Sequence, residues 1–106
     1  MLENFLDEQF ESKVKKEEVS IIQFSASWCG PCKSLRPIME KLSEEYSDKN
    51  YFWAYADIED SGINTGSAMG IRGVPSTIIF RRGVEIDRLV GNPGEQAVRD
   101  FIKNSV

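Results

Sequence analysis

Histidine is absent from this sequence of 106 residues, and cysteine occurs only twice. Without histidine there can be no Ser-His or Cys-His catalytic pair and no metal site with a histidine ligand. Any catalytic chemistry must therefore come from the two cysteines, carboxylates, lysine, tyrosine or the backbone. We expect no metal site.

An excess of positive charge is also missing. The chain has 13 Lys and Arg residues against 17 Asp and Glu residues, which gives a formal net charge of −4 at pH 7. A protein that binds nucleic acid needs a basic face for the phosphates. Nucleic acid is therefore not expected as the main partner.

Long apolar runs are lacking as well. No stretch approaches the roughly 18 apolar residues that a membrane span requires, so no membrane partner is expected. The start of the chain carries Glu3, Asp7 and Glu8, whereas a secretory signal has a positive start and an unbroken apolar run. We therefore expect the protein to stay in the cytoplasm.

The composition is that of one folded domain. Hydrophobic residues make up 41% and charged residues 28% of the chain, which is ordinary for a globular protein. The length matches a single domain, and no repeat or linker divides it. The sequence therefore predicts one domain over residues 1–106.

Apolar spacing predicts an alternation of strands and helices. Strands are expected at 19–24, 51–58, 76–80 and 84–90, and helices at 32–46, within 62–73 and at 93–106. The two strands joined by the turn at 81–83 should form a hairpin, in which the last strand turns its charges outward and its apolar groups inward. The strand–helix–strand unit at 19–58 predicts parallel strands with a right-handed crossover. We expect an α/β fold whose mixed sheet of four or five strands has helices on both faces.

Two local features refine this prediction. Asp7 suits the N-cap of a first helix that carries Phe10 and Val14. Pro37 should kink the long helix, because proline has no N–H to donate.

The cysteines form a Cys-x-x-Cys pair between the first strong strand and the long helix. A helix N-terminus stabilises a thiolate through its unpaired N–H groups and its dipole, so Cys29 and Cys32 suit a dithiol that cycles with a disulfide. Gly30 permits the tight turn, and Pro31 presets the first helical φ.

Three other interpretations of the pair stay open. A structural disulfide would contribute roughly 2 kcal/mol for so short a loop, and it lacks an oxidising compartment if the protein is cytoplasmic. Half of a zinc site would need ligands from carboxylates or a second chain. Chance buried thiols are the third alternative. Cys-x-x-Cys beside a strand–helix–strand unit is, however, typical of redox motifs.

Three segments carry a family resemblance. They are Phe24–Lys33 (FSASWCGPCK) with the following Pro37, then Gly70–Ser76 (GIRGVPS), and Val90–Gly91 before the last helix. On these residues the chain resembles the thioredoxin family over essentially its whole length. The resemblance implies the thioredoxin fold and a thiol–disulfide oxidoreductase that reduces protein disulfides through Cys29 and Cys32.

The resemblance implies a role for several individual residues. Cys29 would be the solvent-accessible nucleophile, and Cys32 would be the shielded thiol that resolves the mixed disulfide. Pro75 would be a cis-proline facing the cysteines, although an ordinary turn proline fits the sequence as well. Lys33 would assist the thiolate by its charge, or would simply be solvated.

The resemblance also implies a flat apolar surface on which an extended substrate docks. Its residues would be Trp28, Gly30, Pro31, Ile58, Gly73, Val74 and Gly91. For Ile58 and Val74, plain core packing is the alternative.

The sequence departs from the family at two positions. Gln23 stands where thioredoxins usually have a buried aspartate beneath the second cysteine, and Tyr55 stands near the place of a frequent lysine. An amide cannot take a proton from the resolving thiol, so we expect altered proton transfer at Cys32. Gln23 and Tyr55 could instead hydrogen-bond each other. Asp57 lies on the Tyr55 side of the same strand.

The expected partners also follow from the resemblance. It implies electrons from a thioredoxin reductase, protein disulfides as substrates, no bound cofactor and a monomer. The alternative function is a thioredoxin-fold binding module or subunit with little turnover.

Overall fold

The structure, a computed structural model, describes residues 2–106. Its centre is a five-stranded sheet in the order β1-β3-β2-β4-β5. The strands are β1 (Glu3–Asn4), β2 (Val19–Ser25), β3 (Phe52–Asp57), β4 (Ser76–Arg81) and β5 (Val84–Val90). β3 pairs in parallel with β1 and β2, whereas β4 is antiparallel to both β2 and β5. The predicted mixed α/β sheet is confirmed, and the two-residue strand β1 was missed.

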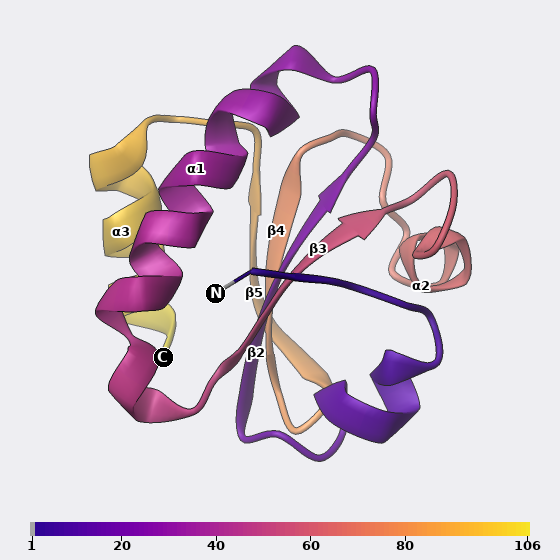
Figure 1. Ribbon diagram of the computed structural model, residues 1–106, viewed down its shortest axis with the longest axis horizontal. Helices are drawn as coiled ribbons and strands as arrows, with labels where there is room; N and C mark the ends of the chain where they lie inside the picture. The colour runs from indigo at the N-terminus through magenta and orange to yellow at the C-terminus, as the bar shows by residue number, and fades with distance from the viewer. Residues whose placement is uncertain (1) are drawn as a thin grey trace.

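Helices cover both faces of this sheet (Figure 1). The long helix α1 (Gly30–Glu45) and the C-terminal helix α3 (Glu95–Ser105) lie on one face. The short helices η1 (Phe10–Val14) and α2 (Ile63–Ala68) lie on the other, and η2 (Ser47–Lys49) follows α1. Each predicted helix is therefore present, and α1 begins two residues earlier than its predicted start at Cys32.

The alternation of side chains along β2 divides the core between the two faces. Ile21 packs with Leu35 and Met39 of α1 in one buried cluster, to which α3 adds Val98. Neighbouring residues of β2 point to the opposite face, where they join a second cluster with β3, β4 and the N-terminal segment. β2 is buried along its whole length, and four of its seven residues, Val19, Ile21, Ile22 and Phe24, are apolar. Packing on both faces therefore fixes the position of β2, from whose end the chain leads to the cysteines.

Asp7 has a different partner from the predicted one. Its carboxylate accepts hydrogen bonds from the N–H groups of Asn64 (3.0 Å) and Thr65 (2.8 Å), at the start of α2. The residue before η1 is Gln9, whose side chain makes no capping bond. The prediction that Asp7 caps the first helix was wrong, because the chain turns before η1 and brings this carboxylate to α2.

The inward and outward faces of β5 also differ from the prediction. Val84, Ile86 and Val90 are 65%, 40% and 62% exposed. A register shift beside Ile79 and Phe80 breaks the simple alternation against β4, as a bulge does. The hairpin itself forms, and its turn has positive φ at Arg82 (49°) and Gly83 (85°), as a tight hairpin requires.

Pro37 lies inside α1 as the sequence indicates, and the kink stays a prediction. Within residues 2–106, no helix combines the length and the apolar character that crossing a membrane would require.

Candidate active site

The cysteine pair lies at the start of α1, just after the loop that follows β2. Cys29 is the residue before the helix, and its sulfur accepts a hydrogen bond from the backbone N–H of Cys32 at 3.2 Å. Gly30 and Pro31 form the first turn. A side chain that accepts a free helical N–H caps the helix, and the positive end of the helix dipole favours negative charge there. The start of α1 therefore presents a backbone N–H donor and the positive end of the helix dipole to the Cys29 sulfur.

A disulfide joins Cys29 and Cys32, whose Cα atoms lie 5.3 Å apart. Cys32 is fully buried, and Cys29 is only 4% exposed in this disulfide form. Cys29 is more exposed than Cys32, as predicted. The expectation that Cys29 is solvent-accessible is wrong for the disulfide form, because only 4% of the residue is exposed. The reason is packing: Ala26 and Val74 lie against the two sulfur-bearing side chains.

Pro75 lies in a segment that faces the disulfide. The Val74–Pro75 peptide bond is cis, as predicted. The Val74 carbonyl oxygen lies 3.7 Å from the Cys29 sulfur. The N–H of Gly91 donates to the Pro75 carbonyl at 2.8 Å, which ties the turn after β5 to this segment. The structure thus places Val74 beside Cys29 and links Gly91 to the adjacent Pro75.

The other predicted docking residues divide into two groups. Gly30, Pro31 and Gly73 are exposed, and Trp28 is 66% exposed, with its indole N–H held by the Glu59 carboxylate at 2.9 Å. Ile58 is half-buried and packs instead against the second core cluster, so for this residue the packing alternative describes its contacts.

Gln23 lies directly beneath the second cysteine, as the sequence indicates. It is fully buried, and its side-chain N–H₂ donates to the Cys32 carbonyl at 3.0 Å and to the Ser25 hydroxyl at 2.9 Å. Gln23 is in register with Tyr55, but its amide bonds to Cys32 and Ser25. The alternative of a Gln23–Tyr55 hydrogen bond was wrong. The Tyr55 ring instead lies 4.1 Å from the Arg36 guanidinium.

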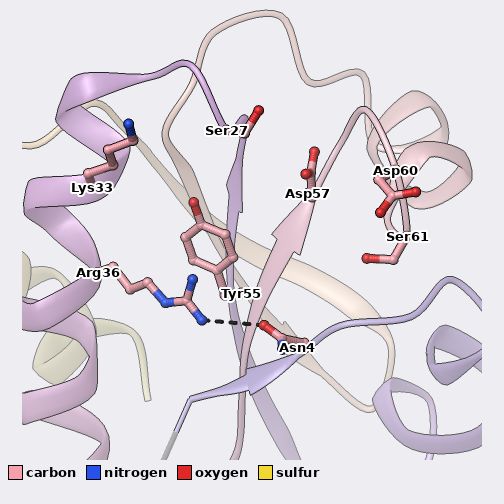
Figure 2. A pocket seen from close by; sticks show the side chains of 8 residues that line it. All are labelled: Asn4, Ser27, Lys33, Arg36, Tyr55, Asp57, Asp60 and Ser61. Carbon is pink, nitrogen blue, oxygen red and sulfur yellow. Dashed lines mark hydrogen bonds between the residues drawn. The ribbon is translucent and has the colours of Figure 1, made fainter.

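A cleft of about 550 Å³ opens next to the motif (Figure 2). Lys33 and Arg36 reach it from α1, and Tyr55 and Asp57 reach it from β3. The remaining lining residues are Asn4, Ser27, Asp60 and Ser61. Arg36 donates to the Asn4 side chain at 3.3 Å across the cleft. Lys33 is exposed on this wall, and the Asp57 carboxylate accepts the Glu59 N–H at 2.9 Å.

Comparison with known proteins identifies the family. The thioredoxin family model matches residues 2–104. The chain belongs to the thioredoxin family. Thioredoxin of Rickettsia conorii is 32% identical over 107 residues, which covers 100% of both chains. Mitochondrial Thioredoxin-2 of Schizosaccharomyces pombe is 34% identical over 90 residues, 85% of this chain, and the match spans only 64% of that relative's own length.

A solved structure agrees with the family. The crystal structure of Malassezia sympodialis thioredoxin, Mala s 13, has a TM-score of 0.87 to this chain at 26% identity, over 99% of this chain and 90% of that one. Thioredoxin-family membership and the Cys29–Cys32 pair together identify the chemistry as thiol–disulfide oxidoreduction. Among residues 2–106, no group of three or more His, Cys, Asp or Glu side chains could hold a metal ion.

Some residues around this thioredoxin-family site were missed by the sequence reasoning. Arg36 and Asn4 line the cleft from segments 32 residues apart, and no local pattern joins them. Glu59, which holds the Trp28 indole, follows the end of β3 by two residues. The one signal that could have identified Glu59 was its position directly after the predicted strand at 51–58, because ligands bind beyond the carboxyl ends of parallel strands.

Proposed function

We propose that this chain carries electrons to the disulfides of other proteins, with Cys29 as the nucleophile and Cys32 as the resolving thiol. The observation that carries the proposal is the asymmetry of the pair. The Cys29 sulfur accepts the Cys32 N–H at the start of α1, and Cys29 is 4% exposed, whereas Cys32 is fully buried.

The reaction consists of two thiol–disulfide exchange steps. The Cys29 thiolate attacks one sulfur of the substrate disulfide, and the other substrate sulfur leaves as a thiolate. Cys32 then loses its proton and attacks the Cys29 sulfur, which releases the second substrate thiolate. The chain is left with its Cys29–Cys32 disulfide, and the substrate has gained two electrons and takes up protons from water.

The exposed part of the site suits an extended protein segment as substrate. Trp28, Pro31 and Gly73 give an open apolar face beside Cys29, and the Val74 backbone lies next to its sulfur. For regeneration we propose a thioredoxin reductase as electron donor, with no cofactor bound to this chain. We further propose a cytoplasmic monomer. Sedimentation at 12.0 kDa and cell fractionation test these last two points.

Insulin reduction tests the main proposal. With thioredoxin reductase and NADPH, the chain should reduce insulin, and the Cys29→Ala variant should not. Repeating the assay with dithiothreitol in place of the reductase tests the electron donor separately from the carrier function. If the chain reduces insulin with dithiothreitol but not with thioredoxin reductase, only the choice of reductase is contradicted. No turnover with either donor would overturn the carrier function.

A binding module is the second candidate, because Gln23 replaces the usual carboxylate beneath Cys32. It predicts tight binding to one partner without insulin turnover. Turnover by the wild-type chain excludes it.

A further inference from the structure

One buried acceptor beside the disulfide has no hydrogen-bond donor. The oxygen Oε1 of the Gln23 side chain is buried and unpartnered among residues 2–106. The orientation of the amide is determined by its other half, because the Cys32 carbonyl can only accept a hydrogen bond and must face the N–H₂ group. A buried acceptor without a donor is costly in free energy.

Reduction creates a new hydrogen-bond donor on Cys32, the residue that the Gln23 amide contacts. In the disulfide the Cys32 sulfur carries no proton, whereas in the dithiol its S–H is a donor. Cys32 is fully buried, so this S–H cannot be satisfied by bulk water. The Gln23 amide already contacts the backbone of Cys32 at 3.0 Å. Reduction thus creates a buried donor on the residue whose backbone the Gln23 amide contacts, and Oε1 of that amide is an acceptor without a donor among the described residues.

We propose that Gln23 is a positioning residue that accepts a hydrogen bond from the Cys32 thiol through Oε1, and that it thereby stabilises the dithiol relative to the disulfide. The inference rests on the proposed redox function. The disulfide takes two electrons from two glutathione thiols, which become glutathione disulfide. Cys32 takes a proton, and Cys29 ends as thiol or thiolate according to the pH. Gln23 itself exchanges neither electrons nor protons.

Thr77 is the competing donor. It is in register with Gln23 on β4, is fully buried, and its hydroxyl is also unpartnered among the described residues. If the Thr77 hydroxyl donated to Oε1 in both redox states, Gln23 would have no preference for the dithiol. In the disulfide form the two groups do not bond to each other, which favours Cys32.

Glutathione redox buffers test the proposal directly. After equilibration, alkylation and mass spectrometry give the dithiol-to-disulfide ratio of each variant. Gln23→Leu should shift the ratio about tenfold toward the disulfide, which is about 30 mV for a two-electron couple. Gln23→Met should shift the dithiol-to-disulfide ratio equally. It provides a second variant for the test if Gln23→Leu does not fold.

Ser20→Ala is the matched control. Ser20 lies on the same strand, is equally buried and has a hydroxyl that is likewise unpartnered within residues 2–106, but its side chain alternates to the face away from Gln23. It should leave the ratio unchanged, as should Thr77→Val. A wild-type ratio in Gln23→Leu, or an equal shift in Ser20→Ala, would overturn the inference while leaving exchange with glutathione, and hence the proposed function, intact.

The S–H stretching band gives a second readout. In a Cys29→Ser background Cys32 is the only thiol of the chain, because the sequence has two cysteines. Its band should lie at a hydrogen-bonded frequency and should move to the free frequency when Gln23→Leu is added. A band that does not move would contradict the proposed bond even if the redox ratio changes.

Discussion

At the residue scale, the two sulfurs differ in position more than in chemistry. Cys29 precedes α1 and accepts the Cys32 N–H, whereas Cys32 lies inside the helix and is fully buried. A sulfur at a helix N-terminus is the better nucleophile, because its thiolate is stabilised there.

Single cysteine variants should therefore fail differently. Cys29→Ser should abolish insulin reduction, because no thiolate remains to attack. Cys32→Ser should form mixed disulfides with substrates and retain them, which non-reducing electrophoresis would detect. Covalent trapping by Cys29→Ser instead would reverse the assignment of the two roles.

A carboxylate at position 23 should change the titration of the site. In Gln23→Asp, a buried acid and the neighbouring thiols would titrate as a coupled set. Cys29 alkylation against pH should follow a single step in the wild-type chain and gain a second in the variant. Resolution of the mixed disulfide near neutral pH should also become faster.

Stability provides the check on that variant. Burial of a carboxylate costs desolvation free energy, so Gln23→Asp should be no more stable to urea than the wild type. An unchanged pH profile and an unchanged resolution rate would show that the proton leaves Cys32 by another route.

At the element scale, Asp7 joins the N-terminal segment to α2. Burial raises the pKa of this carboxyl, but hydrogen bonds from the N–H groups of Thr65 and Asn64 outweigh burial and hold the pKa below its usual 3.8. A lowered pKa means that the interaction stabilises the fold above the unfolded-state pKa and is lost as the pH falls through the folded-state pKa.

Asp7→Ala should lower the free energy of unfolding by about 1 kcal/mol at neutral pH, because α2 loses its cap. Urea unfolding should show this deficit shrinking as the pH falls below the usual carboxyl pKa of 3.8 toward the lower folded-state pKa of Asp7. Glu8→Ala is the control, since Glu8 is an exposed neighbour. A deficit that is constant with pH would contradict the capping interaction.

Arg88 joins β5 to the segment after α2. Its guanidinium donates twice to the Glu85 carboxylate and once to the Met69 carbonyl, each at 2.8 Å. The hydrogen bond from Arg88 lowers the pKa of Glu85. This arrangement gives the edge strand a contact outside the sheet.

Arg88→Ala should therefore destabilise the protein by about 1.5 kcal/mol, as expected for hydrogen bonds to charged groups. Arg81→Ala is the matched control, because its ion pair with Glu18 is exposed and 3.7 Å long. Its effect should stay within about 0.5 kcal/mol. Equal effects in urea unfolding would show that the Met69 and Glu85 contacts contribute nothing beyond a surface charge.

At the scale of the whole molecule, both core clusters share β2 and the sheet. One strand that is buried on both faces couples the helices on either side. We therefore expect the chain to unfold in a single cooperative transition, as small single domains usually do.

Reduction of the disulfide should lower the stability of that one unit. In the chain-entropy model, closure of so short a loop contributes about 2 kcal/mol. Calorimetry should show one transition in each state and a melting temperature several degrees lower with dithiothreitol. The Cys29→Ala/Cys32→Ala double variant should not respond to the reductant. Two separate transitions would contradict the single domain.

Local patterns were enough to predict the longer strands and helices and the Cys29–Cys32 pair, whereas the two-residue strand β1 was missed. The apolar run at 19–24, the helical spacing after Cys32 and the turn at 81–83 act over a few residues, so their structure follows from propensity and turn chemistry. The Cys-x-x-Cys spacing before a helix likewise carries its chemistry in the sequence itself.

Tertiary contacts decided the rest. Asp7 caps a helix 57 residues away, Val84 and Val90 are exposed on the edge strand β5, and the cleft joins Asn4 to Arg36. The unsatisfied oxygen of Gln23 follows from the Cys32 carbonyl, which accepts the hydrogen bond of the amide N–H₂. These features arise where distant segments pack together, and packing is a property of the whole fold that no short stretch of sequence contains.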